Sequence, residues 1–387
     1  MKKVVLLQRI LPHYRVPLVR ALRDHLSTAG IDLVLAYGQE RKDSVPQTVR
    51  IEEPWAHYIA NYYATLHGVT FVVQSVGSVL RQADLIVVEH ANQLLVNHWL
   101  LVAQELTHRK VAFFGHAKNF QARAPTGLRE RLRGITLRYA DWWFAYTEAS
   151  KKLVVAAGFP EARVTVVNNS IDTRLLAQAL LRVNEAQLAL LRSRLGLLGT
   201  NVGVFCGGMY PAKRLDFLLQ ACLRIRALVP DFEMILVGEG PSKDLAVAAA
   251  DEFKWIHYVG AKTGNDLAAI YRLGKVLLMP GVVGLVLIDS FVGMLPLFTT
   301  NSSSHGPEIE YLQSGVNGVI VGQDVDAYSH TVVEHLVNDE KRHRLIKGCE
   351  ASAREFSLDM MVARFATGIQ QCLTTPGRRK HRTFPTS

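Results

Sequence analysis

Short apolar runs alternate with longer amphipathic stretches through the first half of the chain. A run rich in aliphatic and β-branched residues indicates a buried strand, whereas apolar residues three or four apart indicate one face of a helix. Strands that alternate with helices form βαβ units, so we expect a parallel sheet. Beginning with a strand, the expected strands and helices follow in turn over Lys3–Gln8, Val16–Leu26, Ile31–Ala36, Val69–Leu80, Leu85–Glu89, Leu94–Leu106 and Val111–Gly115.

The same alternation returns in the second half of the chain. The break falls at a strand and polar turn over residues 164–172. We therefore expect an α/β fold with two doubly wound parallel-sheet (Rossmann-like) domains facing a cleft, residues 1–172 and 173–357. A helix over residues 358–374 and a basic tail over residues 375–387 follow. The second series runs over Val202–Cys206, Leu215–Ala227, Glu233–Val237, Asp244–Ala250, Trp255–Tyr258, Asp266–Tyr271 and Val276–Met279, then a helix from Leu285.

The composition narrows the class of protein. Of 387 residues, 49% are hydrophobic and 20% are charged, a profile typical of a soluble globular protein and not of a disordered one. No apolar run reaches the roughly 18 residues of a membrane span, and the N-terminus lacks the apolar length of a secretory signal. The four cysteines include no C-x-x-C pair, so neither a zinc site nor a disulfide framework is indicated. We expect a cytoplasmic protein.

Positive charge is concentrated in one segment. The net charge is +10, and residues 107–138 contain eight basic residues against one acid, Glu130. Such a segment favours anionic partners, namely a phospholipid surface, a lipid pyrophosphate or nucleic acid. We do not expect nucleic acid, because no zinc-finger spacing or RNA-binding signature is present. The eight basic residues are Arg109, Lys110, Lys118, Arg123, Arg129, Arg131, Arg133 and Arg138.

Within that segment, the apolar residues Leu128, Leu132, Ile135 and Tyr139 fall at helical spacing, with arginines off the stripe. A basic amphipathic helix of this kind either lies on anionic lipid or packs its apolar face on the core of the domain. The pattern leaves both readings open. If the helix lies on lipid, we expect it to contact the inner face of the cell membrane.

The stretch from Val276 to Asp289 combines an apolar strand, a turn closed by Pro280, Gly281 and Gly284, and a helix with an acid in its first turns. Ligands bind beyond the carboxyl ends of parallel strands, and free N–H groups at a helix start favour an anion. The stretch resembles the donor-site motif Glu-Gly-Phe-Gly-Leu-x-x-x-Glu of the retaining, nucleotide-sugar-dependent glycosyltransferases with the GT-B fold, also called family 4. Gly281 stands at the first acid position of that motif and Asp289 at the second.

Further segments match the same family in order. Residues 207–216 resemble its Gly-Arg-x-x-x-x-Lys-Gly-x-Asp motif, with Gly208 in place of the Arg, Lys213 on the Lys, and Arg214 where Gly is usual. Residues 237–241, with Gly238, resemble its Val-Gly-x-Gly-Pro turn. His116 stands where the family places a first-domain histidine that faces the sugar. Weaker landmarks are His305-Gly306-Pro307-Glu308-Ile309, Asn317-Gly318 and the turn with Asn169 and Asp172.

The resemblance implies a nucleotide-sugar site on the second domain and an acceptor site on the first. Lys213 and Arg214 would meet the diphosphate, or are solvated surface bases. Asp289 would accept from the ribose hydroxyls, or only complements the helix dipole. The expected donor-binding residues are Gly207, Gly208, Lys213, Arg214, Gly238, Gly284, Leu285, Val286 and Asp289, and the expected catalytic residues are His116 and Lys213.

The acceptor side is less determined by the sequence. His13 and Arg15 lie in the first strand-to-helix loop, where relatives usually carry glycines. They would hold an acceptor phosphate, or Arg15 simply sits in the opening turn of the helix. His116 is either a site residue or a structural histidine at the end of a strand.

Taken together, the resemblance implies a retaining, metal-independent glycosyltransferase with no cofactor, which transfers sugar from a nucleotide diphosphate to a glycan or lipid-pyrophosphate-linked acceptor in surface polysaccharide biosynthesis. In relatives, the last helix crosses back to the first domain. The departures at Gly208 and Gly281 keep two alternatives open. One is a nucleotide-sugar epimerase on the same fold, and the other is a catalytically silent homologue that binds a nucleotide sugar. Donor sugar, acceptor and linkage do not follow from the sequence.

Overall fold

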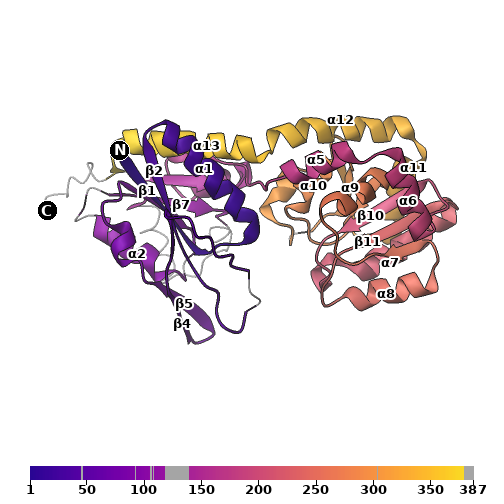
Figure 1. The fold of residues 1–387 in the computed structure, drawn as a ribbon, viewed down its shortest axis with the longest axis horizontal. Coiled ribbons are helices and arrows are strands. Elements are labelled where there is room, and N and C mark those ends of the chain that lie inside the picture. The colour runs from indigo at the N-terminus through magenta and orange to yellow at the C-terminus, as the bar shows by residue number, and fades with distance from the viewer. Residues whose placement is uncertain are drawn as a thin grey trace. The chain divides into compact units, whose positions relative to one another are not determined.

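The computed structural model describes residues 1–44, 47–91, 93–104, 107, 109–117, 139–302 and 304–378. The chain divides into two compact units (Figure 1). Unit 1 consists of Met1–Ile171 with Leu358–Ser387, and unit 2 consists of Asp172–Ser357. Each unit is built around a parallel sheet flanked by helices, which confirms the expected α/β class.

Unit 1 contains a parallel sheet in the order β3-β2-β1-β6-β7-β8-β9. The strands are β1 (Lys2–Ile10), β2 (Ile31–Gly38), β3 (Ala56–Tyr58), β6 (Leu85–Glu89), β7 (Lys110–Gly115), β8 (Trp142–Ala145) and β9 (Val164–Val166). The helices are α1 (Val16–Thr28), α2 (Leu95–Ala103), α4 (Glu148–Ala156) and α13 (Leu358–Thr374), and short 3-10 turns occur at η1 (His13–Arg15), η2 (Gly77–Leu80) and η5 (Glu161–Arg163).

Alternation along β1 divides the core of unit 1 into two layers, because successive side chains of a strand point to opposite faces. Val4 and Leu6 belong to the layer that includes α1 and α13. Val5 and Leu7 belong to the layer that includes α2 and α4. All four side chains are at most 2% exposed, as expected for a strand in the middle of a doubly covered sheet.

Helix α13 lies beside α1 and covers one face of the sheet of unit 1 (Figure 1). Phe365 packs between Phe114 and Phe144, with ring centroids 5.0 and 4.5 Å away. Lys110 Nζ donates to the carbonyls of Cys372, Leu373 and Thr375 at 2.6–2.8 Å, and so satisfies the orphan acceptors of the helix C-terminus. Lys110, one of the cations of the basic segment, therefore has a structural role.

The expectation of a helix over residues 69–80 is wrong. These residues form β5 (Val69–Gln74), which pairs antiparallel with β4 (Asn61–Leu66), followed by η2. The two-residue turn between the strands has φ of 48° at His67 and 75° at Gly68, and left-handed residues in such a turn match the twist of a hairpin. Val72 and Val73 are β-branched and favour the strand.

Unit 2 contains a parallel sheet in the order β12-β11-β10-β13-β14-β15. Its strands are β10 (Asn201–Cys206), β11 (Phe232–Val237), β12 (Ile256–Tyr258), β13 (Val276–Leu278), β14 (Leu297–Thr300) and β15 (Gly318–Val321). Its helices are α5 (Arg174–Arg182), α6 (Glu185–Leu195), α7 (Leu215–Leu228), α8 (Lys243–Glu252), α9 (Gly264–Leu273), α10 (Val286–Val292), α11 (Val325–Val337) and α12 (Asp339–Glu355), with 3-10 turns η6 (Pro211–Lys213) and η7 (Pro307–Tyr311).

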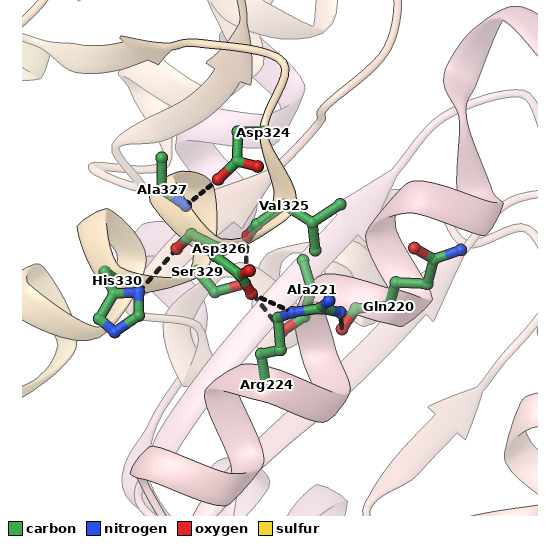
Figure 2. A network of polar contacts seen from close by, with 9 residues as sticks. All are labelled: Gln220, Ala221, Arg224, Asp324, Val325, Asp326, Ala327, Ser329 and His330. Carbon is green, nitrogen blue, oxygen red and sulfur yellow. Dashed lines mark hydrogen bonds and ion pairs between the residues drawn. The ribbon is translucent and has the colours of Figure 1, made fainter.

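Helices α7 and α11 pack against each other and are joined by polar contacts (Figure 2). Arg224 Nε donates to the Asp326 carboxylate at the surface. The Ser329 hydroxyl is buried and lies within hydrogen-bonding distance of the Val325 carbonyl (2.7 Å) and the Ala221 carbonyl (3.3 Å). These contacts fix the position of α7. This helix begins directly after the first loop of the candidate site.

Several expectations fall on residues outside the described ranges. They include the amphipathic pattern from Leu128 to Ile135 and most of the basic segment, namely Lys118, Arg123, Arg129, Arg131, Arg133 and Arg138. Of the expected basic tail, the structure describes Arg378, whose Nη1 donates to the Ala140 carbonyl at 3.2 Å. Within the described ranges, no helix combines the length and apolar character that a membrane span requires.

The fit of α13 on the sheet gives a first prediction. A Cβ atom at Gly368 would lie 2.5 Å from Thr165 Oγ1 and 2.7 Å from a ring carbon of Phe144. Gly368→Ala should therefore lower the free energy of unfolding of unit 1 by about 1–3 kcal/mol, even though alanine is the better helix former. Denaturant unfolding followed by tryptophan fluorescence measures this, with Trp142 and Trp143 reporting from unit 1. Thr367→Ala on the exposed side of α13 is the control, and equal stability of the two variants would contradict the close packing.

Candidate functional site

The topology of unit 2 identifies where a ligand would bind. From β10 the chain proceeds to β11 and β12 on one side and then returns to β13 on the other side. The switch point therefore lies between β10 and β13, which pair at Gly203↔Val276 and Val204↔Leu277. In open α/β sheets, ligands bind outside the carboxyl ends of the strands at such a point. Most of the residues that we expect to bind the donor lie in the loops after these two strands.

Glycines allow the loop after β10 to touch the loop after β11. Gly207 N donates to the Val237 carbonyl at 3.1 Å. At Gly238, φ is 143° and a Cβ atom would lie only 1.9 Å from the Gly207 oxygen, so no other residue fits. Gly208 faces the half-exposed Tyr210 ring, which is 3.3 Å from the position of a Cβ atom. The tyrosine therefore borders the space into which a longer side chain at position 208 would extend.

Arg214 adopts a left-handed conformation with φ 54° and ψ 52°. This explains why glycine is usual at that position, because a side chain there is strained. The guanidinium carbon lies 4.4 Å from the centroid of the Phe217 ring, in a cation–π contact. The structure thus places the Arg214 guanidinium against the Phe217 ring.

Lys213 is buried, with 6% of its surface exposed, so the alternative of a solvated surface lysine is wrong. Its Nζ donates to the Val282 carbonyl at 2.5 Å and lies 5.5 Å from the centroid of the Tyr210 ring. Burial lowers the pKa of Lys213 from its ordinary value of 10.5 to about 8. The side chain is therefore mostly charged at neutral pH. An ammonium group has three donors, and within the described residues only one of them is used, in the bond to Val282.

Among the described residues, six hydrogen bonds fix the backbone of residues 280–283. They hold the turn after β13 against β14 and the loop after β10, so its shape is determined before any ligand arrives. The six are Thr300 Oγ1 to Pro280 O (2.7 Å), Thr299 Oγ1 to Gly281 O (3.4 Å), Val282 N to Ala212 O (2.9 Å), Lys213 Nζ to Val282 O (2.5 Å), Val283 N to His305 Nδ1 (3.0 Å) and Gly306 N to Val283 O (2.8 Å).

His305 joins this turn to strand β14 in one defined tautomer. Nδ1 accepts from Val283 N–H, so Nε2 carries the proton and donates to the Thr300 carbonyl at 2.7 Å. The ring is 6% exposed, and burial lowers its pKa. The sequence showed His305 only as part of a landmark. Its contact to the turn depends on the folded arrangement, and no local pattern indicates it.

The structure explains why an acid is missing from the donor motif. A Cβ atom at Gly281 would lie 2.3 Å from the Ala212 oxygen and 2.4 Å from the carbonyl carbon of Lys213. The turn packs directly on the backbone of η6 at this point, so no side chain fits at position 281. In this chain, the contact between the two loops replaces the first carboxylate.

Backbone N–H donors and one carboxylate acceptor lie at the start of α10. Among the described residues, no acceptor contacts the amides of Gly284, Leu285 or Val286, and a Cβ atom at Gly284 would meet nothing within 4 Å. Asp289 follows in the first turn, and its carboxylate has no hydrogen-bond partner within the described residues. Although the side chain reaches the surface, burial raises its pKa from 3.8 to about 7.

Asp289 also lies near the end of β10. Burial raises the pKa of Cys206, the last residue of that strand, to about 11, and the Asp289 charge contributes to this shift. The structure therefore brings Lys213, Asp289 and the free amides of Gly284 to Val286 together at the switch point of unit 2. In the part of the chain that the structure describes, no group of three or more His, Cys, Asp or Glu residues is placed to hold a metal ion.

In unit 1, the switch point lies between β1 and β6. The 3-10 turn η1 after β1 separates its two expected site residues. His13 is exposed and lines an open hollow of about 760 Å³ together with Arg20 and Arg50. Arg15 is 7% exposed, precedes α1 and donates from Nη2 to the Tyr146 hydroxyl at 3.1 Å. The two side chains thus have different surroundings.

His116 directly follows β7 at the carboxyl end of the sheet of unit 1. Its carbonyl accepts from Ser150 Oγ at 3.1 Å, and its ring meets the Tyr146 ring edge to face at 6.0 Å. His90 occupies the equivalent place after β6, where burial and then the His116 and His98 charges lower its pKa to about 3. His90 and Tyr146 were missed in the sequence, although each directly follows a buried strand.

Two family descriptions match the chain. "Glycosyltransferase Family 4" matches residues 17–175, and "Glycosyl transferases group 1" matches residues 200–338. Among curated proteins, the D-inositol 3-phosphate glycosyltransferase of Salinispora arenicola is 27% identical over 218 residues, which covers 52% of this chain and 48% of the relative. The chain therefore spans about half the length of the curated relatives that it matches.

Solved structures resemble the chain over nearly its whole length. HepE of Anabaena in complex with UDP and glucose has a TM-score of 0.65 and 14% identity, and the match covers 96% of this chain and 100% of that protein. A glycosyltransferase of Rickettsia africae has a TM-score of 0.68 and 12% identity, with 97% and 100% coverage. At such identities the likeness shows the fold alone, and it confirms the expected GT-B fold.

The contact at Gly281 gives a second prediction. Gly281→Ala should destabilise unit 2 and weaken nucleoside diphosphate binding at least tenfold, because the added Cβ displaces the turn that carries the free amides. Gly284→Ala is the matched control for stability, since its Cβ enters open space. Thermal unfolding of both variants and calorimetric titration of Gly281→Ala measure these effects. A Gly281→Ala protein as stable as Gly284→Ala would show that the two loops are not in close contact.

The raised pKa of Asp289 gives a third prediction. Its folded value of about 7 exceeds the ordinary 3.8, so the folded state binds the extra proton and stability falls as pH rises from about 4 through 7. Asp289→Asn cannot ionise. Its stability relative to the parent should therefore increase between pH 5 and pH 8, on the order of a few kcal/mol at most. Urea unfolding of both proteins at both pH values tests this. A difference in stability between Asp289→Asn and the parent that stays constant with pH would contradict the burial of the Asp289 carboxyl.

Proposed function

Since the chain belongs to the glycosyltransferases of the family 4, group 1 type and has their GT-B fold, we propose that it transfers a sugar from a nucleotide-diphosphate donor to a glycan or lipid-linked acceptor, with retention at the anomeric carbon. The observation that carries the proposal is the arrangement at the switch point of unit 2. There the buried cation of Lys213, the free amides at the start of α10 and the Asp289 carboxylate lie together. These groups complement a diphosphate and a ribose.

The chemistry requires positive groups in this position. Cleavage of a sugar–phosphate bond develops negative charge on the leaving diphosphate while the sugar becomes oxocarbenium-like. Lys213 supplies a charge that the bond to Val282 already orients, and the Gly284, Leu285 and Val286 amides supply further donors. Because these groups are fixed before the reaction, they stabilise the developing charge without reorganisation. The proposed mechanism uses these protein donors at the diphosphate and needs no metal ion there.

The remaining donor residues have distinct proposed roles. Asp289 accepts from the ribose hydroxyls, most strongly in its ionised form. Gly207, Gly208 and Gly238 let the backbone approach the donor. Arg214 adds a second cation if its guanidinium leaves the Phe217 ring.

On unit 1, we propose that His116 faces the transferred sugar, since it lies at the carboxyl end of β7, where site residues of open sheets collect. The acceptor is proposed to be a glycan or lipid-pyrophosphate-linked precursor of a surface polysaccharide. The net charge of +10 and the basic segment of residues 107–138 support an anionic acceptor or contact with an anionic membrane at the inner face of the cell membrane. HepE supports UDP as one donor nucleotide to test, since its structure contains UDP and glucose.

One alternative has an observation in its favour. A silent homologue that binds a nucleotide sugar without turnover would also lack the motif residues replaced by Gly208 and Gly281. Incubation with a panel of nucleotide sugars, with and without lipid extract, separates the possibilities. A transferase releases nucleotide and labels an acceptor, an epimerase produces an isomeric sugar without an acceptor, and a silent homologue binds without any product.

Lys213 gives a fourth prediction. Lys213→Ala should lower turnover by roughly a hundredfold or more, the usual effect of removing one preorganised charged donor. It should also lower stability somewhat, because the partly buried Val282 carbonyl loses its partner. Lys243→Ala is the control, since Lys243 is a half-exposed lysine of the same unit that pairs with Glu239. Initial rates of nucleotide release compare the two, and turnover of Lys213→Ala within a few-fold of the control would rule out the role.

A further inference from the structure

Among the described residues of unit 1, one buried arginine has no carboxylate partner. Arg15 is 7% exposed, and its Nη1 has no hydrogen-bond partner in the described part of the chain. Within the described residues, its polar contact is the 3.1 Å bond from Nη2 to the Tyr146 hydroxyl. Burying a cation away from water is unfavourable unless other groups compensate for the lost hydration.

Two arginines of α1, the helix that follows Arg15, show how such a charge is usually compensated, namely by a carboxylate partner. Arg23 in α1 contacts Asp32 at 2.8 Å and lies over the Trp55 ring at 5.2 Å. Arg20 pairs with Glu53 at 2.6 Å. Arg15 has the aromatic contacts without the acid, which distinguishes it from both.

Three aromatic rings surround the guanidinium of Arg15. Its central carbon lies 5.3 Å from the centroid of Tyr14 and 5.4 Å from those of Phe114 and Tyr146. Cation–π contacts of this kind offset part of the desolvation and hold the planar group in place. Rings that lie over the plane of the guanidinium do not supply an anion to its in-plane N–H donors. Those N–H donors are the atoms that bind carboxylates and phosphates.

The position of this cluster in the fold favours a ligand. Arg15 ends the turn after β1, Phe114 belongs to β7, and Tyr146 directly follows β8. All three therefore lie at the carboxyl edge of the sheet of unit 1, and β1 borders its switch point. His116, at the end of β7, contacts the Tyr146 ring.

We propose that Arg15, aided by the Tyr146 hydroxyl, binds a phosphate group of the sugar acceptor. The proposal rests on the function proposed above, because it names the chemical class of that acceptor. The guanidinium fork contacts two phosphate oxygens, and the Tyr146 hydroxyl, which accepts from Arg15 Nη2, orients the fork. His13, which faces the open hollow, is not part of this site. A water-soluble sugar phosphate and a lipid phosphate present the same group.

Phosphate binding tests the proposal without any need for turnover. Inorganic phosphate is titrated by ³¹P NMR at constant ionic strength, in a Lys213→Ala background that removes the proposed cation of unit 2. Arg15→Gln should weaken binding about tenfold to a hundredfold, as expected for loss of a charge-assisted contact. The matched control Arg23→Gln removes an arginine from α1, the helix that Arg15 precedes, and should leave binding unchanged. Equal binding by both variants overturns the proposal.

A structural role for Arg15 makes a different prediction. If the guanidinium only supports the aromatic cluster, Arg15→Gln lowers the thermal midpoint and phosphate binding is unaffected, which also overturns the proposal. Arg15→Lys and Tyr146→Phe keep the experiment decisive if Arg15→Gln does not fold. The lysine variant keeps the charge and loses the fork, and the phenylalanine variant loses only the hydroxyl. Both should bind phosphate more weakly than Arg23→Gln does.

The source of the phosphate is distinguished in a second experiment. Parent and Arg15→Lys proteins are assayed for transfer to a sugar phosphate in solution and to vesicles that contain a polyprenyl phosphate. The KM of the true acceptor should rise at least tenfold in Arg15→Lys, whereas the KM of the donor stays the same. If the parent turns over no nucleotide sugar, the proposed function fails, but the phosphate titration still decides the role of Arg15. An unchanged acceptor KM in an active protein overturns the inference alone.

Discussion

The hydrogen bond from the buried Lys213 ammonium to the Val282 carbonyl joins the two loops at the switch point of unit 2. One loop follows β10 and the other follows β13, so this bond and the contact of Gly281 with η6 set their separation. His305 fixes the second loop from the side of β14. The free amides at the start of α10 and the Asp289 carboxylate take their positions from this arrangement. The site is therefore preorganised by contacts within unit 2.

The sequence predicted those features that local chemistry determines. The strands and helices of unit 2 from β10 to the start of α10 followed from its apolar pattern, whereas α5, α6 and the elements after α10 were not predicted. The glycine at position 238 is required by a backbone contact that no other residue permits. The hairpin over residues 61–74 was missed because the apolar run after Val69 also fits a helical pattern. Its identity as a strand depends on pairing with β4 and on two left-handed residues at the turn, His67 and Gly68.

The features that the sequence could not predict depend on contacts between residues that lie far apart in the chain. Burial of Lys213, the bond from Val283 to His305 and the aromatic surroundings of Arg15 each join residues from separate elements. The two departures from the donor motif also need the fold to be understood. At Gly281, the backbone of η6 occupies the place of a side chain, and at Gly208 the Tyr210 ring borders the place of the arginine. The first follows from how the two loops pack at the switch point, and the second from the path of the loop after β10 itself.

A crystal structure with a bound nucleoside diphosphate tests the central claim most directly, namely that the donor binds at this preorganised switch point. The account predicts phosphate oxygens within hydrogen-bonding distance of Lys213 Nζ and of the Gly284 to Val286 amides, with the ribose hydroxyls on Asp289. It also predicts that residues 280–283 keep the conformation seen without ligand. A nucleotide bound away from α10, or one that binds only after this turn has been rebuilt, would contradict the account.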